Sequence, residues 1–142
     1  MAGLKLRAED GEDLAVISAA IQDGVFKMGD VAFDRRQRRL AIQLNRFRWE
    51  ADRRAGASRI RAVLAFEGVL AAQSRKVRLG ESEAVASILA LGFTADAEPP
   101  SGAVEISLAG GGSIRLQVEA LEAVLFDVGE PWGTLNRPDH GR

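Results

Sequence analysis

The chain of 142 residues lacks cysteine and tyrosine altogether, and its one histidine, His140, lies close to the C-terminal end. Without cysteine there is no disulfide bond, no iron–sulfur cluster and no thiolate zinc site. A single histidine cannot build an imidazole-rich metal centre, and it serves a nucleophile as base only if the C-terminal segment folds back into a pocket. We therefore expect no metal ion, no cofactor and no nucleophilic triad.

Long hydrophobic runs are also missing from the sequence. No stretch approaches the roughly 18 consecutive uncharged apolar residues that a transmembrane helix needs. Residues Met1 to Asp10 contain no apolar run of the kind found in signal peptides. We therefore expect a cytoplasmic protein with no membrane partner, and the lack of cysteine is compatible with a reducing compartment.

Hydrophobic residues make up 46% of the chain and charged residues 27%, which is typical of a globular domain with a buried core. The sequence contains no internal repeat and no interdomain linker. We expect a single domain over residues 1–135, followed by a disordered tail over residues 136–142.

Charge is unevenly distributed along the chain, although the formal net charge is −1. From Arg35 to Arg61 there are ten arginines against Glu50 and Asp52, which gives this segment a charge of +8, whereas the remainder carries −9. We expect such a dipolar chain to associate with itself or with an acidic protein partner. Its slightly acidic overall charge does not favour nucleic acid, because dedicated nucleic-acid-binding domains are usually strongly basic.

The N-terminal part predicts a short strand and then a helix. Residues 4–6 alternate as a strand does, and the acidic residues after them indicate a helix start with Asp10 as the N-cap. We predict an amphipathic helix over residues 11–23, ended by Gly24 in the left-handed conformation. Its apolar stripe consists of Leu14, Ile17 and Ile21.

Beyond Gly24 the apolar period changes from about 3.6 residues to about 2, as expected where helix gives way to sheet. Residues 25–33 predict a strand with a bend at Gly29-Asp30, paired as a hairpin with the strand over residues 40–44. A second hairpin is predicted across the turn at residues 110–113. Another predicted strand runs from residue 59 to about residue 73 with a bend at Gly68, and two more cover residues 104–108 and 114–118. Residues 82–93 fit helical spacing as well as alternation, and we favour a strand that ends at residue 93 or 94.

Residues 118–128 have two interpretations. Their apolar residues share one arc when placed at helical steps, and Gly129 and Pro131 follow as they do after a helix, which favours a C-terminal helix. The competing interpretation is a last strand over Glu122–Val128.

These elements predict an α+β fold. It comprises an N-terminal amphipathic helix, a largely antiparallel bent sheet or partly closed barrel of six or seven strands, and a C-terminal helix against one open side. The arrangement is similar to pleckstrin-homology-like barrels, a likeness of architecture that transfers no function.

Arginine occupies inward-facing positions at the end of the strand that begins near residue 40. Arg46 and Arg48 continue its buried series, whereas Phe47 and Trp49 fall on the opposite face. A core does not accept unpaired arginines. Either a bulge at Asn45 returns the two aromatic residues to the core, or the strand emerges at the rim of the sheet and its arginines meet solvent or a partner.

The arginine-rich segment is the candidate surface for an anionic ligand or a nucleic acid. Guanidinium groups bind phosphates, and an aromatic face such as that of tryptophan stacks on bases. The competing interpretation is a solvated basic surface with two core aromatic residues. The candidate binding residues are Arg46, Arg48, Trp49, Arg59 and Arg61.

Two other features have ordinary structural interpretations. The glycines at residues 110–112 are followed by a strand pattern, so they predict a hairpin turn and not a phosphate-binding loop. Carboxylate clusters hold a divalent cation only where two of them converge, and each cluster here fits a helix cap, a loop or a solvent-facing side. The clusters are Glu9/Asp10/Asp13, Glu81/Glu83 and Glu119/Glu122.

Asp127 and Trp132 stand out near the C-terminal end. Asp127 lies within an apolar run, so we expect it to receive backbone donors or an arginine. Trp132 follows Pro131 and is predicted to pack the chain end onto the domain, with an exposed anchor for a partner as the alternative.

Three groups of residues carry a resemblance to a known family. They are Gln22-Asp23, then Asn45-Arg46-Phe47 with Trp49-Glu50, and Val118-Glu119 with Leu125, Asp127, Gly129 and Trp132. From Leu4 to about Trp132 the chain resembles a small alphaproteobacterial family catalogued only as a domain of unknown function. The resemblance implies a one-domain intracellular bacterial protein and supplies no catalytic residue.

Three function hypotheses follow. The first is a non-enzymatic intracellular protein-interaction or regulatory module, a homo-oligomer or the partner of an acidic protein, because charge is dipolar and catalytic groups are scarce. The second is binding of an anionic ligand or nucleic acid through the arginine and tryptophan surface. The third is an enzyme that uses carboxylates as acid and base.

Overall fold

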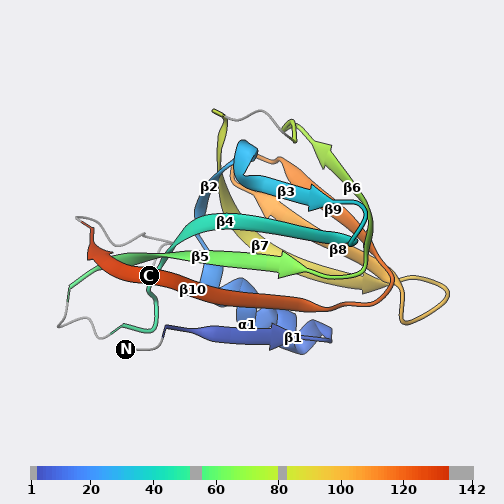
Figure 1. Ribbon diagram of the computed structural model, residues 1–142, viewed down its shortest axis with the longest axis horizontal. Coiled ribbons are helices and arrows are strands. Elements are labelled where there is room, and N and C mark those ends of the chain that lie inside the picture. The colour runs from blue at the N-terminus through green and yellow to red at the C-terminus, as the bar shows by residue number, and fades with distance from the viewer. Residues whose placement is uncertain (1–2, 52–55, 80–82, 135–142) are drawn as a thin grey trace.

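The computed structural model describes residues 3–51, 56–79 and 83–134. These residues form ten strands, one α-helix and one short 3-10 helix (Figure 1). In chain order the elements are β1 (Lys5–Ala8), α1 (Gly11–Ile21), β2 (Val25–Lys27), η1 (Met28–Asp30), β3 (Val31–Asp34), β4 (Arg39–Phe47), β5 (Ser58–Phe66), β6 (Val69–Arg75), β7 (Val85–Ala95), β8 (Gly102–Leu108), β9 (Ser113–Val118) and β10 (Ala123–Gly133).

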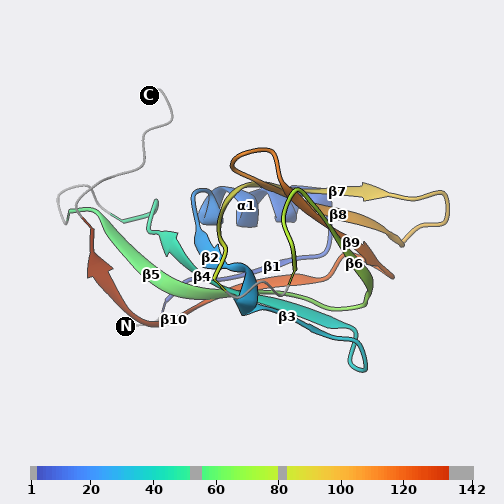
Figure 2. The same cartoon turned by 90° about the horizontal axis from the view of Figure 1, so that it is seen from above.

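All strand pairs are antiparallel, and the strands follow one path in the order β1-β10-β5-β4-β2-β7-β8-β9-β6, with β3 added beside β4. The short strand β2 connects two halves of this sheet. It pairs with β4 through one position, Val25 opposite Asn45, and with β7 through three positions. Seen from above, the half with β4 and β5 and the half with β7 and β8 lie on opposite sides of the molecule, so the sheet is folded over on itself (Figure 2).

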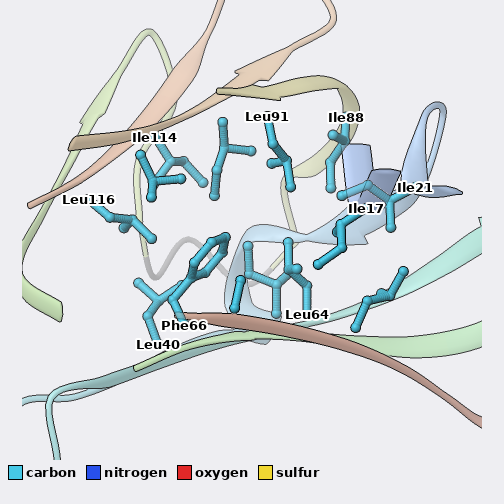
Figure 3. Packing of buried hydrophobic residues seen from close by; sticks show 14 of the residues in the cluster. Ile17, Ile21, Leu40, Leu64, Phe66, Ile88, Leu91, Ile114 and Leu116 are labelled. Carbon is cyan, nitrogen blue, oxygen red and sulfur yellow. The ribbon is translucent and has the colours of Figure 1, made fainter. Parts of the chain in front are cut away.

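The core fills the space between the two halves of the sheet. Figure 3 shows Leu40, Leu64 and Phe66 of one half facing Ile88 and Leu91 of the other. All of these side chains are buried, since each strand directs alternate residues inward. Helix α1 packs against β7, β1 and β4 and contributes Leu14, Ile17 and Ile21 to the same cluster.

The prediction of the N-terminal helix is confirmed in its start and its buried face. The Asp10 side chain accepts a hydrogen bond of 2.8 Å from the backbone N–H of Asp13, as an N-cap does. The predicted role of Gly24 is wrong, because the left-handed residue is Asp23, with φ of 65°. Gly24 is required for space, since a Cβ there would lie 2.8 Å from the backbone oxygen of Ile21.

Both predicted hairpins are confirmed. Strands β3 and β4 pair from Val31 opposite Ile42 to Asp34 opposite Arg39, and β8 pairs with β9 across the glycine turn. Gly110 and Gly111 have φ of 88° and 93°, values that favour glycine, which explains why the turn is built from this residue.

The predicted C-terminal helix is wrong, and so is the count of six or seven strands in an α+β fold. Residues Ala123–Gly133 form strand β10, which lies between β1 and β5 and hydrogen bonds to both. Leu121, Ala123 and Leu125 are buried at every second position, so the period that matters is 2 and not 3.6. Tertiary pairing on both sides overrides the helical spacing.

The remaining extra strands arise where predicted strands divide. The 3-10 turn η1 separates β2 from β3, and Gly68, with φ of 67°, separates β5 from β6. Within the described residues the sheet path ends at β1 and β6, so the sheet is open and not a closed barrel, and the likeness to pleckstrin-homology-like barrels is lost with the C-terminal helix. The tail predicted over residues 136–142 lies outside the described residues.

Candidate functional site

Arg46 follows neither of the two alternatives that the sequence left open. Strand β4 keeps regular register with β5 from Leu40 to Phe47, so there is no bulge at Asn45. The side chain of Arg46 also does not emerge at the rim, because it is 0% exposed. It continues the buried series of β4 and remains in the interior with carboxylate partners.

The partners of Arg46 are Asp127 of β10 and Glu50. Its Nε and Nη2 atoms donate to the two carboxylate oxygens of Asp127 at 2.7 Å each, and Nη1 and Nη2 donate to Glu50 at 2.9 and 2.6 Å. Asp127 also accepts a hydrogen bond of 2.8 Å from the backbone N–H of Leu4. The expectation that Asp127 receives backbone donors or an arginine therefore agrees with the structure, and it receives both.

The arginine side chain crosses a whole strand to reach Asp127. Strand β5 lies between β4 and β10, so the two backbones are about 10 Å apart at the usual strand spacing. Ala62 pairs with both Leu44 and Asp127 and fills the intervening position with a single methyl group. A small residue there leaves the long arginine side chain room to lie over β5.

The ion pairs shift the pKa values of their members. Burial alone would lower the pKa of Arg46, but its hydrogen bonds and charge interactions with Glu50 and Asp127 outweigh burial and raise it. The hydrogen bonds from Arg46 lower the pKa of Glu50, although partial burial opposes that shift. Arg46 and Glu50 are therefore both held in their charged forms.

A cavity of about 400 Å³ lies beside this cluster, and we call it the end cavity. Its cause is an irregularity in β10, where the chain advances four residues from Val128 to Trp132 while β5 advances two, from Arg61 to Arg59. Gly129 makes this bulge with φ of 76°. The cavity is lined by Gly3, Leu4, Arg48, Glu50, Ile60, Asp127, Gly129, Glu130 and Pro131.

The structure does not bring the five candidate binding residues onto one surface. Arg46 is buried on the inner face of the sheet, whereas Arg59 and Arg61 lie on the outer face of β5, opposite Phe47 and Asn45 of β4. Arg48 lines the end cavity and donates to Ser58 Oγ at 3.1 Å.

Arg59 and Trp49 are occupied by contacts inside the protein. Arg59 donates to the backbone oxygens of Asp23 and Asn45 at 3.3 and 3.2 Å, and burial lowers its pKa despite the nearby charge of Asp23. The indole N–H of Trp49 donates to the backbone oxygen of Gln22 at 3.0 Å, and its ring lies 4.6 Å from that of Phe47. These contacts fix the connection between α1 and β2 against the end of β4.

The arginines of the +8 segment that the structure describes are distributed over two ends of β4. Four of them lie at the β3–β4 turn, where Arg38 pairs with Glu119 and Arg39 pairs with Glu67. The others lie at the far end of the nine-residue strand, about 26 Å away at 3.3 Å per residue. Arg53 and Arg54 lie outside the described residues.

Other predicted features also have a clear position in the structure. Trp132 is 43% exposed, at the end of the β10 bulge. Within the described part of the chain, no three acidic or histidine side chains converge as metal ligands, and no helix has the length and apolar character needed to cross a membrane. His140 and Glu81 fall outside the described residues.

A comparison with protein-family models matches residues 4–140 to DUF2948, which is described as a protein of unknown function. The chain belongs to the DUF2948 family. The predicted family is therefore confirmed, while its bacterial origin stays a prediction. A search of curated proteins found no match, and neither did a search of solved structures.

Most of the residues on which the family resemblance rests gather at the end cavity and the neighbouring end of β4. Asp127, Glu50 and Gly129 line the cavity. The sequence did not identify Glu130 and Pro131 as lining residues of a cavity, because residues 129–131 fit a helix end equally well. It also gave no indication that the N-terminal residues Gly3 and Leu4 reach this place. The alternation that carries Asp127 into the buried row of β10 is the signal that could have found the bulge after it.

Proposed function

We propose that this DUF2948 chain is a non-enzymatic protein-interaction module that binds its partner at the end cavity. The observation that carries the proposal is the bulge of β10, which opens a cavity of about 400 Å³ whose lining includes Pro131, the residue before the exposed Trp132 in the chain. Tryptophan is enriched among the residues that dominate binding energy at protein interfaces. A cavity next to such an anchor is where a partner side chain can be received.

The walls of the end cavity are held in place before any partner arrives. Arg46 makes four hydrogen bonds to Glu50 and Asp127, and Leu4 is fixed to Asp127 by two backbone contacts: its N–H donates to the Asp127 carboxylate at 2.8 Å, and its carbonyl accepts from the Asp127 N–H at 3.0 Å. A preformed site loses less conformational entropy on binding than a flexible one. This favours a recognition surface over an adjustable loop.

The same contacts do not favour acid–base catalysis. A general acid needs a carboxyl group whose pKa is raised towards neutrality. The pKa of Glu50 is shifted downward by Arg46, and the oxygens of Asp127 already accept from Arg46 and Leu4. Both carboxylates serve to hold the cavity wall.

Site-specific photo-crosslinking tests the proposal. A photoreactive amino acid at Trp132, irradiated in an extract of the protein's own cells, is expected to give one prominent adduct that mass spectrometry identifies. The matched control carries the same group at Leu70 of β6, which is 46% exposed against 43% for Trp132. An adduct of twice the chain mass identifies a second copy as the partner, and any other mass identifies a different protein.

Binding is then measured with the purified partner or, for self-association, by sedimentation. Trp132→Ala is expected to weaken binding at least tenfold, since interface hot spots contribute about 2 kcal/mol or more. Leu70→Ala is expected to leave binding unchanged. Adducts of equal yield at both positions, or binding that survives Trp132→Ala, would refute the proposal.

A further inference from the structure

A second cavity, of about 150 Å³, opens on the outer face of the sheet, the face of β5 opposite to the one that carries Ile60. We call it the outer groove. It is separate from the end cavity, because the two cavities share no lining residue. It is lined by Val25, Phe26, Lys27, Asp30, Gln43, Leu44, Asn45, Arg61 and Val85.

The register of three strands explains why these residues meet. Arg61 of β5 pairs with Asn45 of β4, which pairs with Val25 of β2, so their side chains form one row across the sheet. After this single position β2 and β4 separate, because the chain turns into η1 instead of continuing beside β4. The groove is the opening that this separation leaves, and Lys27 stands on its β2 side.

Two cations border the outer groove without a counter-ion from the described part of the chain. The ion pairs of the described residues include neither Lys27 nor Arg61. The side-chain hydrogen bond recorded for Arg61 is a 3.5 Å contact to Gln43 Oε1, at the upper limit of hydrogen-bond length. Asp30 is the one acidic residue in the lining, so the groove carries a net charge of +1.

Asn45, which also lines the outer groove, has an unsatisfied polar atom. Its Oδ1 atom is buried and has no hydrogen-bond partner, which is rare for a polar side-chain atom in a folded protein. The two ends of an asparagine amide are nearly equal in size, and a half-turn about χ2 exchanges the acceptor for a donor. With the amide turned, Nδ2 would donate to an oxygen held between Lys27 and Arg61.

We propose that the outer groove binds the oxyanion group of a small ligand, a carboxylate or a phosphate. The planar fork of Arg61 and the ammonium group of Lys27 supply charge-assisted hydrogen bonds, and the Asn45 amide supplies a neutral third donor. The cavity volume of about 150 Å³ leaves ample room for one such group. The site retains Arg61 from the arginines singled out in the sequence and adds Lys27 and Asn45.

Titration of the isotope-labelled protein, followed by NMR, tests the site. Inorganic phosphate and acetate are added in separate experiments at constant ionic strength, with sodium chloride as the compensating salt. Saturable shifts are expected at the side-chain amide of Asn45 and at the backbone amides of Val25 and Lys27. Tighter binding of phosphate than acetate identifies a phosphoryl ligand, and the reverse order identifies a carboxylate ligand.

Charge-neutral variants locate the binding. Arg61→Gln and Lys27→Gln are each expected to weaken the anion at least about tenfold, because a hydrogen bond to a charged group is lost. The matched control is Arg115→Gln, which removes an exposed arginine of β9 whose side chain is 59% exposed. The control is expected to bind as the unaltered protein does.

Three results would overturn the inference. Chloride alone, at equal ionic strength, could produce the same shifts, or Arg115→Gln could weaken the anion as much as Arg61→Gln. The Asn45 amide could also stay unchanged at millimolar concentrations of both anions. Because none of these measurements involves Trp132 or a protein partner, they fail or succeed independently of the proposed interaction at the end cavity.

Discussion

Replacing Asp127 with asparagine keeps the size of the side chain and removes the negative charge that faces Arg46. In the structure Arg46 is 0% exposed and Asp127 3% exposed, and two hydrogen bonds of 2.7 Å join them. The substitution leaves a buried guanidinium group with Glu50 as its remaining carboxylate partner. An amide group also presents a donor where Asp127 now accepts from Arg46 and Leu4.

The expected cost is set by the charge that stays behind. Removing one member of a buried ion pair costs about 3–5 kcal/mol. Glu50 remains to neutralise Arg46, so we place the cost of Asp127→Asn at the lower end of this range, about 3 kcal/mol of unfolding free energy. The compensation is incomplete, because the Glu50 side chain is 45% exposed. The double substitution Arg46→Met with Asp127→Asn removes the buried cation as well. It should cost about 2 kcal/mol less than the sum of the two single substitutions.

Urea denaturation measures these differences. With a slope of about 2 kcal/mol per molar urea, Asp127→Asn is expected to lower the unfolding midpoint by about 1.5 M. The control is Glu105→Gln, which removes an exposed partner of Arg115 at 3.8 Å and should change stability by less than about 0.5 kcal/mol. If Asp127→Asn costs no more than the control, or if the single effects simply add, the buried ion pair does not hold this end of the sheet.

Three further predictions concern Glu50 and two glycines. Arg46 lowers the pKa of Glu50, so the Glu50 carboxylate stabilises the fold above pH 4.5 and loses that contribution as the pH falls through the lowered pKa. Glu50→Gln should therefore lose less stability below pH 4.5 than the unaltered protein does, which urea titrations at several pH values would show. Gly129→Ala should cost about 1 kcal/mol, since φ is 76° with open space around it, whereas Gly133→Ala, also in open space but without a positive φ, should be close to neutral in thermal denaturation. Gly24→Ala should cost about 1–3 kcal/mol, because its Cβ would lie 2.8 Å from Leu44 Cδ1, and an unchanged melting temperature would contradict that contact.

Local pattern determined a large part of this fold. The acidic start of α1 and its N-cap at Asp10 follow from interactions within four residues, and the structure has both. The alternating segments of β4, β5, β8 and β9 follow from burial on one face, and they appear as strands with the expected residues inside. Glycine at the β8–β9 turn follows from the backbone angles that such a turn requires.

Residues 118–128 mark the limit of local pattern. Their apolar residues fit a helical arc and an alternating strand equally well, and the choice depends on what lies beside them. Strand β10 has β1 on one side and β5 on the other, and both supply hydrogen bonds that a helix at this place would leave unmade. The nearest of these partners in sequence is more than 50 residues away, so no short window could contain the deciding contact.

The candidate site shows the same division between sequence and structure. The alternation of the strand reaches Arg46, but the sequence predicted a bulge or an exposed rim there and not a buried arginine. For Asp127 it predicted backbone donors or an arginine as partners, because a charge in an apolar row needs partners. The two residues are 81 positions apart, and their meeting depends on β4, β5 and β10 lying side by side with Ala62 between them. Tertiary structure decided that pairing, and with it the burial of Arg46 and the division of the remaining arginines between the two ends and faces of the sheet. Strand order is fixed by free energy summed over many distant contacts, which the residues of any one segment do not contain.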